Sequence, residues 1–209
     1  MTSASDTAYL TIRDLIVEGK LRPGDLLIAE ELAKRCGVSR TPVREAIQRL
    51  QSELFAQRLD NKRTVVRSWS ADEIEDFFEL RLRLAGYMAA RAAQRITTAQ
   101  LAQLKAVHGR MQTLSAAEHD GEAFSRAHEG FYQLLGEIAG SERLQLISWR
   151  IINSAPPFVR CECSVQAADT EMVRDHEDLI MALEAQDPVW AEAAMTVRLR
   201  KTYRRSQLV

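Results

Sequence analysis

The stretch GVSRTPVREAIQRL, residues 37–50, combines an apolar stripe with a cluster of small and basic polar residues. The apolar members repeat at the spacing of one helix face: Val43, Ala46, Ile47 and Leu50. Ser39 is a favoured N-cap residue, and Pro42 falls in the first turn, where a missing N–H costs little. The opposite face of the predicted helix carries Ser39, Arg40, Thr41, Arg44 and Gln48. A helix N-terminus attracts phosphate, and arginine can pair with guanine, so we predict that this face binds DNA.

The segments around this helix predict a winged helix-turn-helix. Helical patterns cover residues 7–19 and about 29–35, and Gly37 ends the second. Two β-leaning runs, residues 55–59 and 64–69, flank the polar stretch DNKR and predict a hairpin. Its tip is basic, and Lys62 and Arg63 are expected to reach a neighbouring groove or the DNA backbone.

The charge distribution agrees with an anionic partner. The chain has a net charge of −1, yet residues 34–67 contain nine basic and three acidic side chains. Such a concentration is typical of a surface that binds nucleic acid, although a solvated basic face can have the same composition. The charge therefore supports the helix prediction and does not decide it alone.

The overall composition describes an ordinary globular protein, with 46% hydrophobic and 27% charged residues. No apolar run approaches the roughly 18 residues that cross a bilayer, and the N-terminus lacks a secretory pattern, so we expect a cytoplasmic protein without membrane contact. The three cysteines have neither disulfide-framework nor zinc-motif spacing. We expect no cofactor.

The chain from residue 70 onward is predicted to be entirely helical. Ser70 and Glu73 form a capping-box pattern that starts a long helix, and Asp187 and Pro188 are the expected cap and first residue of the last helix. The predicted helices cover residues 71–95, 98–115, 121–139, 141–154, 170–186 and 188–207. We therefore predict a mostly α fold of two domains: a winged helix-turn-helix of three helices and a β-hairpin wing at residues 1–69, and an all-α bundle at residues 70–209.

The first domain resembles a known family. The stretch PGDLLIAEELAKRCGVSRTPVREAIQRL, residues 23–50, is similar to the N-terminal domain of GntR-type bacterial transcription regulators. The second domain resembles the FCD effector domain of the FadR branch, through FELR (78–81), GFYQLLGEIAGSERL (130–144), RDHEDLIMALEAQD (174–187) and AEAAMTVRL (191–199). The resemblance implies a homodimer, mostly repressing, that binds a palindromic operator in double-stranded DNA. It also implies control by a small, usually carboxylate-bearing metabolite.

Three positions depart from the pattern of the first domain. Glu30 stands where the family can have a DNA-contacting arginine, so that contact is expected to be absent. Leu54 and Arg63 stand where glycine is usual, after the recognition helix and at the wing tip. A side chain at either position restricts positive φ.

The second domain departs from the family's metal site. Many FCD domains bind a divalent metal through one aspartate and three histidines. By resemblance, His128 replaces the aspartate, Tyr132 and Arg198 replace two histidines, and His176 alone is retained. A guanidinium is a poor ligand for a metal ion, so we expect no metal here, with His128 as the only possible additional ligand.

Arg198 could instead supply positive charge to an anionic effector through paired hydrogen bonds. The hypothesis is that Arg198, His128, Tyr132 and His176 hold a carboxylate directly. The family also implies an arginine on the first effector-domain helix, for which Arg81 is the match. Core packing would explain the sequence positions of His128 and Tyr132 equally well.

Two other classes of function are alternatives to a DNA-binding regulator. A helical metal-dependent phosphohydrolase could use the His119–Asp120 pair with His108, His128 and His176, and a helical scaffold could carry a vestigial DNA-binding domain. No nucleophile–base arrangement is visible, so we expect no enzyme. His108 and His119 are otherwise predicted to lie at the surface. Trp149 and Trp190 are predicted to lie in the core or in a dimer contact, and Cys161 and Cys163 in a connection.

Overall fold

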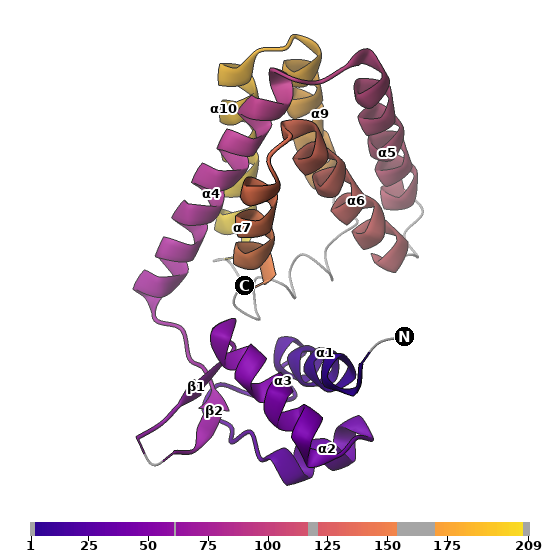
Figure 1. The fold of residues 1–209 in the computed structure, drawn as a ribbon. Helices are drawn as coiled ribbons and strands as arrows, with labels where there is room; N and C mark the ends of the chain where they lie inside the picture. Colours follow the sequence, from indigo (N-terminus) through magenta and orange to yellow (C-terminus); the bar gives the residue numbers. More distant parts are fainter. Residues whose placement is uncertain (1–2, 61, 117–120, 154–169, 207–209) are drawn as a thin grey trace. The chain divides into compact units, whose positions relative to one another are not determined.

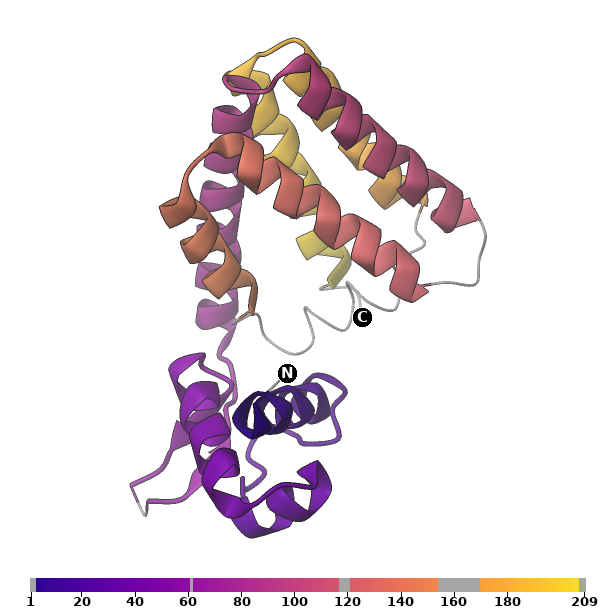
Figure 2. The same ribbon diagram turned by 45° about the vertical axis from the view of Figure 1, so that its right-hand side comes forward.

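The computed structural model describes residues 3–60, 62–116, 121–153 and 170–206 (Figures 1 and 2). Contacts divide the described chain into two compact units, the first extending to Ile74 and the second containing helix α4 from Glu75 and the helices after it. No helix among these residues is both long and apolar enough to cross a membrane.

The first unit has three helices followed by a two-stranded hairpin. The helices are α1 (Ala4–Val17), α2 (Ala29–Cys36) and α3 (Arg40–Ser52), and the strands are β1 (Ala56–Arg58) and β2 (Thr64–Val66). The strands are antiparallel, with Ala56 opposite Val66 and Arg58 opposite Thr64. The winged helix-turn-helix prediction is therefore confirmed.

The second unit contains helices only, in the described part of the chain. These are α4 (Ala71–Ala93), α5 (Thr98–Ala116), α6 (Gly121–Ala139), α7 (Glu142–Asn153), α9 (Thr170–Glu184) and α10 (Pro188–Ser206). The predicted caps form: Ser70 and Glu73 exchange hydrogen bonds at the start of α4. The Asp187 carboxylate accepts the N–H groups of Val189 and Trp190 at the start of α10.

Two local features differ from the sequence prediction. Helix α1 begins at Ala4, not at residue 7, because Ser3 caps it and forms a capping box with Asp6. A short bridge joins Leu26 to Val65 and adds a third segment to the hairpin. This pairing is long-range in sequence, so the Pro-Gly turn before Leu26 gave no sign of it.

The apolar stripe of α3 is buried as predicted. Val43, Ala46, Ile47 and Leu50 of α3 all lie in the core of the first unit. They pack with Ala8, Ile12 and Ile16 of α1, and α1 and α3 are in extensive contact. Burying a side chain of this size contributes about 1.5–3 kcal/mol, so this packing determines which face of α3 remains exposed.

A Schellman motif ends α3 and places Leu54 in the left-handed region, with φ 63°. The Phe55 N–H donates to the Leu50 carbonyl at 2.9 Å, and the Leu54 N–H donates to the Gln51 carbonyl at 3.2 Å. Phe55 and Leu50 are both buried. The position at Leu54 normally favours glycine, because a Cβ atom disfavours this conformation.

We expect Leu54→Gly to be more stable than Leu54→Ala by about 1 kcal/mol, the approximate cost of a left-handed non-glycine residue. Both variants remove the half-exposed leucine side chain, so their difference isolates the backbone conformation. Urea unfolding of the full chain measures it. A glycine variant less stable than the alanine variant, as in an ordinary helix, would contradict a left-handed Leu54.

Candidate nucleic-acid interface and ligand site

The exposed face of α3 carries the five residues predicted from its sequence. The side chains of Ser39, Arg40, Thr41, Arg44 and Gln48 are all exposed. Ser39 occupies the N-cap position, but its hydroxyl makes no capping hydrogen bond. The N-terminus of α3 therefore presents backbone N–H groups, a hydroxyl and two guanidinium groups to solvent, a combination suited to phosphate.

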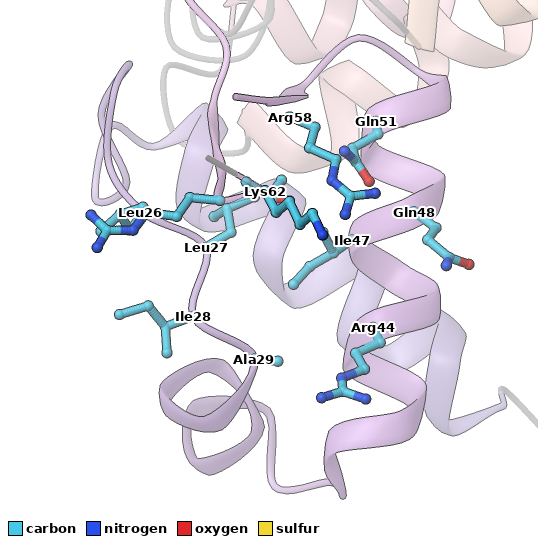
Figure 3. A pocket seen from close by; sticks show the side chains of 12 residues that line it. Leu26, Leu27, Ile28, Ala29, Arg44, Ile47, Gln48, Gln51, Arg58 and Lys62 are labelled. Carbon is cyan, nitrogen blue, oxygen red and sulfur yellow. The ribbon is translucent and has the colours of Figure 1, made fainter. Parts of the chain in front are cut away.

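A groove of about 700 Å³ lies between this face and the hairpin (Figure 3). Its polar lining comes from Arg44, Gln48 and Gln51 of α3 and from Arg58, Lys62 and Arg63 of the hairpin. Leu26, Leu27, Ile28 and Ala29 form an apolar wall. Four cationic side chains thus surround one groove, which matches the strongly positive character of protein–DNA interfaces.

Arg58 and Gln51 were not among the residues predicted from the sequence. Arg58 lies on β1 and points toward α3 in Figure 3. Its membership of the basic segment 34–67 was a signal, but its position depends on the pairing of the hairpin. Arg44, Arg58 and Lys62 form no ion pair within the described residues, so their charges are available to an anionic ligand.

The hairpin turn takes a conformation that differs from the predicted one. The Leu59 N–H donates to the Arg63 carbonyl at 2.8 Å, and the Lys62 N–H donates to the Leu59 carbonyl at 2.9 Å. Of the turn residues that the structure describes, Lys62 is left-handed, with φ 64°, and Arg63 has no positive φ. The conformational cost that was expected at Arg63 therefore falls on Lys62.

Arg40 differs from the other basic residues because it already has a partner. Its guanidinium lies 3.0 Å from the carboxylate of Glu30, in the first turn of α2, and both side chains are more than half exposed. Exposed pairs of this kind contribute little to stability. The pair nevertheless places a negative charge beside a predicted DNA contact.

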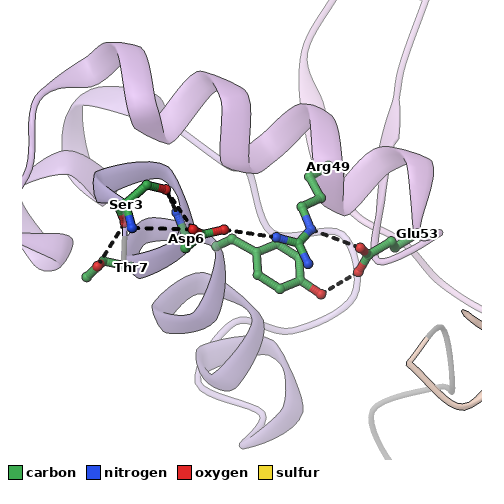
Figure 4. A network of polar contacts seen from close by, with 6 residues as sticks. Ser3, Asp6, Thr7, Arg49 and Glu53 are labelled. Atoms are coloured by element: carbon green, nitrogen blue, oxygen red, sulfur yellow. Dashed lines mark hydrogen bonds and ion pairs between the residues drawn. The ribbon is translucent and has the colours of Figure 1, made fainter. Parts of the chain in front are cut away.

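A polar network ties α1 to the far side of α3 (Figure 4). The Arg49 guanidinium lies 3.0 Å from Glu53 and 3.3 Å from Asp6, and stacks 3.7 Å from the centre of the Tyr9 ring. The Tyr9 hydroxyl donates to Glu53. Burial, followed by the bond to Glu53, raises the pKa of Tyr9. Arg49 thus holds the recognition helix in place instead of facing the groove.

The second unit brings together the predicted ligand residues from α6, α9 and α10. An Nη2 atom of Arg198 donates to Nε2 of His128 at 2.9 Å, and the Tyr132 hydroxyl lies 3.3 Å from Nε2 of His176. The Arg198 guanidinium lies 5.0 Å from the Tyr132 ring centre, and the rings of His128 and His176 are 5.5 Å apart. Arg198 and His176 are buried, so a permanent cation sits in the interior of this unit.

Arg81 of α4 contributes a second positive charge. Burial, followed by the charges of Arg198 and Arg81, lowers the pKa of His128 to about 3. His128 is therefore neutral and accepts the hydrogen bond from Arg198. Arg83, two residues along α4, is exposed.

His108 was predicted to lie at the surface, and this prediction is wrong. The residue is buried on α5, and its Nε2 atom lies 3.0 Å from the Val173 carbonyl. The His108 ring centre is 6.2 Å from that of His176. The sequence around His108 has no motif, so only the packing of α5 against α9 reveals its position.

The residues in this cluster do not suit the divalent metal that the family resemblance implied. Arg198 donates to the His128 nitrogen that would otherwise be a ligand. Among the described residues, no group of three or more histidine, cysteine or acidic side chains could hold a metal ion. The buried Arg198 guanidinium, 2.9 Å from the His128 nitrogen, would also repel a metal cation bound at that nitrogen.

The remaining residues singled out from the sequence are two exposed tryptophans and four residues outside the described part of the chain. Trp149 and Trp190 are exposed, which excludes the core position, and the alternative of a dimer contact stays a prediction. His119, Asp120, Cys161 and Cys163 lie outside the described residues. The phosphohydrolase alternative therefore rests on a pair that has no described position.

Two family models match the chain. The model described as bacterial regulatory proteins, gntR family, matches residues 4–66, and the FCD domain model matches residues 76–201. The structure is similar to that of E. coli McbR/YncC, with a TM-score of 0.74, 20% identity, and coverage of 100% of this chain and 99% of the other. This similarity extends over both units.

Two curated relatives are similar in sequence. The HTH-type transcriptional repressor RspR of Escherichia coli (strain K12) is 29% identical over 198 residues, covering 92% of this chain and 84% of RspR. The Nta operon transcriptional regulator of Aminobacter aminovorans is 32% identical over 146 residues, covering 70% of this chain and 68% of that protein.

The depressed pKa of His128 predicts a pH dependence of stability. Unfolded His128 binds a proton below its ordinary pKa of 6.5, whereas folded His128 stays neutral down to about 3. Its stabilising contribution is therefore complete above pH 6.5 and is lost as the pH falls toward 3.

We expect the melting temperature of the wild type to fall more between about pH 7.5 and about pH 5.5 than that of His128→Gln. Glutamine keeps an acceptor for Arg198 but does not titrate. Thermal unfolding of both chains at the two pH values makes the comparison. An equal fall in both would contradict a neutral, buried His128.

Proposed function

This chain belongs to the gntR family of bacterial regulatory proteins and carries an FCD domain, and we propose that it is a homodimeric repressor controlled by a carboxylate metabolite. It is a transcription regulator, not an enzyme. In this proposal residues 1–69 bind operator DNA, and residues 70–209 bind the effector and hold the dimer together.

The groove between α3 and the hairpin carries the DNA-binding part of the proposal. The exposed edge of α3 provides Arg44 and Gln48 for base edges, and Ser39, Arg40 and Thr41 for phosphates at the helix N-terminus. Lys62 and Arg63 of the hairpin, together with Arg58, supply further phosphate contacts from the other side. One duplex can therefore meet both walls of the groove.

Repression is supported by the likeness to RspR, which is named as a repressor and is similar over most of this chain. A repressor of this kind binds its operator until an effector changes the affinity. In thermodynamic terms, the effector must interact differently with the DNA-binding and the released states.

The cluster around Arg198 supports the effector proposal. A buried arginine beside a neutral histidine and a tyrosine provides a charge and several hydrogen-bond partners for a carboxylate. Arg81 adds positive potential from α4, and the His176 ring lies 5.5 Å from that of His128. The two guanidinium groups supply the positive charge that a metal ion would otherwise give to an anion, so we propose that the site needs no metal ion.

The predicted role of Arg44 can be tested on DNA. Selection from a random duplex pool identifies the preferred sequence, and binding is then measured on this duplex and on a scrambled one. If Arg44 pairs with a guanine, Arg44→Ala should lose about 1–3 kcal/mol of binding free energy on the selected duplex. Lys62→Ala should weaken binding to both duplexes equally and reduce the salt dependence.

Arg110 provides a matched control, because it is an exposed arginine on α5 of the second unit. Arg110→Ala should leave both affinities unchanged. If Arg44→Ala keeps both affinity and sequence preference, the assignment of this face is wrong. If the wild type shows no sequence preference at all, the proposal of a specific regulator fails.

The effector proposal predicts stabilisation by small carboxylates. Acetate, succinate and citrate are added to the full chain, and thermal unfolding is compared with that in the corresponding neutral amides. At least one carboxylate should raise the melting temperature of the wild type, because a ligand that binds only the folded state stabilises it. Tyr132→Phe, which keeps the ring, should reduce this shift, and Arg198→Met should abolish it.

Arg110→Met is the control for charge removal and should respond like the wild type. The melting temperatures without ligand show whether Arg198→Met folds, and Tyr132→Phe supplies the test if it does not. Equal shifts with acids and amides would contradict the proposal. Stoichiometric zinc or nickel in the purified protein, lost on replacing His176, would contradict a metal-free site.

A further inference from the structure

Helix α2 begins with an isoleucine at a position that normally favours a polar residue. Ile28 is the N-cap, with φ −87° and ψ 112°, and its side chain makes no capping hydrogen bond. Serine, threonine, aspartate and asparagine are preferred there, because their oxygen atoms accept a backbone N–H of the first turn. Glu31 stands at the N3 position, where a serine at residue 28 would complete a capping box. Helix α2 therefore has one half of a stabilising motif and lacks the other.

The core of the first unit does not explain this isoleucine. Leu27 directly precedes the cap and Leu32 is the fourth residue of the helix, the two positions of a hydrophobic staple. Both belong to the core and are 6% and 3% exposed, respectively. Ile28 itself is 41% exposed. Burial of its side chain therefore does not compensate for the missing cap.

Ile28 lines the groove between α3 and the hairpin instead. Leu26, which pairs with the hairpin two residues earlier, is also 41% exposed and lines the same groove. Residues i and i+2 of an extended segment lie on one side of it, and Leu27 between them is buried. Figure 3 shows Ile28 and Arg44 on opposite sides of the groove. Two apolar side chains are thus exposed in a groove whose four cationic side chains suit DNA.

We propose that Ile28 is a specificity-determining residue that contacts the 5-methyl group of a thymine in the major groove. The inference rests on the DNA-binding function proposed above. A thymine methyl is an apolar group on the base edges of this groove, and apolar side chains recognise it by direct contact. Arg44 and Gln48 supply only hydrogen-bonding groups from α3, so Ile28 adds a kind of recognition that they do not provide. A residue that lowers stability where it improves recognition is typical of a functional site.

Thermal unfolding of the full chain without DNA tests the first part of this argument. Ile28→Ser should raise the melting temperature, because serine completes the capping box with Glu31. Ile28→Val keeps an apolar side chain and gains no cap, so it should melt close to the wild type. A lower melting temperature of Ile28→Ser would show that the isoleucine supports the fold and would overturn the proposal.

Deoxyuridine tests the contact itself, because it differs from thymidine only in the missing methyl group. Each thymine of the duplex that the wild type selects from a random pool is replaced singly, and binding of the full chain is measured. The wild type should lose about fourfold in affinity at one or more positions, the factor expected for burying one methyl-sized group.

The same duplexes then identify the residue that makes the contact. Ile28→Ser should lose this factor on the thymine duplex and nothing further on the deoxyuridine duplex, as a double-mutant cycle requires for two groups in contact. Ile28→Val should keep most of the discrimination. Leu10→Ser is the matched control, since Leu10 is 38% exposed on α1 and is not among the described residues that line this groove. It should discriminate like the wild type.

Three results with DNA would overturn the proposal. Equal deoxyuridine losses in the wild type and in Ile28→Ser would assign the methyl contact to another residue. Equal weakening of both duplexes by Ile28→Ser would indicate a contact with the sugar-phosphate backbone. A wild type that prefers one sequence but tolerates every deoxyuridine would read no thymine methyl. A wild type without any sequence preference would instead refute the regulator proposal on which this inference rests.

Discussion

The packing of α3 against α1 is the constraint on which the candidate DNA interface depends. Val43, Ala46 and Leu50 are fully buried, and a helix that buries one face must expose the opposite one. Arg44 and Gln48 therefore reach solvent as a consequence of core packing. The Arg49 network on Tyr9 adds a polar contact on the same side and leaves the groove side of α3 to other residues.

The second unit contains a buried charge, the guanidinium of Arg198. Arg198 is in the interior, where an isolated cation would be costly. Its hydrogen bond to neutral His128 and its position over Tyr132 reduce this cost. A guanidinium can bind a carboxylate through paired hydrogen bonds, and this chemistry supports the proposal of a carboxylate effector here.

Local signals in the sequence predicted most of the fold, and tertiary contacts explain the remainder. The caps at Ser70 and Asp187 and the stripe on α3 are written within a few neighbouring residues, and all are confirmed. The burial of His108 was not predictable, because it depends on the packing of α5 against α9. The cluster at Arg198 joins residues of three helices, so only a family resemblance could indicate it before the structure.

The ion pair between Arg40 and Glu30 changes the charge of the predicted DNA-binding surface, because Glu30 stands where the family can have an arginine. A carboxylate beside the N-terminus of α3 repels phosphate. Arg40 can therefore bind a phosphate either by breaking its ion pair with Glu30 or by placing its guanidinium between the phosphate and the Glu30 carboxylate. The same carboxylate can accept a hydrogen bond from the amino group of cytosine. An acidic residue at this position would therefore weaken phosphate contacts, which are independent of DNA sequence, and favour base contacts, which depend on it. In the proposed DNA interface, discrimination between specific and non-specific DNA would therefore depend on α2 as well as on the recognition helix.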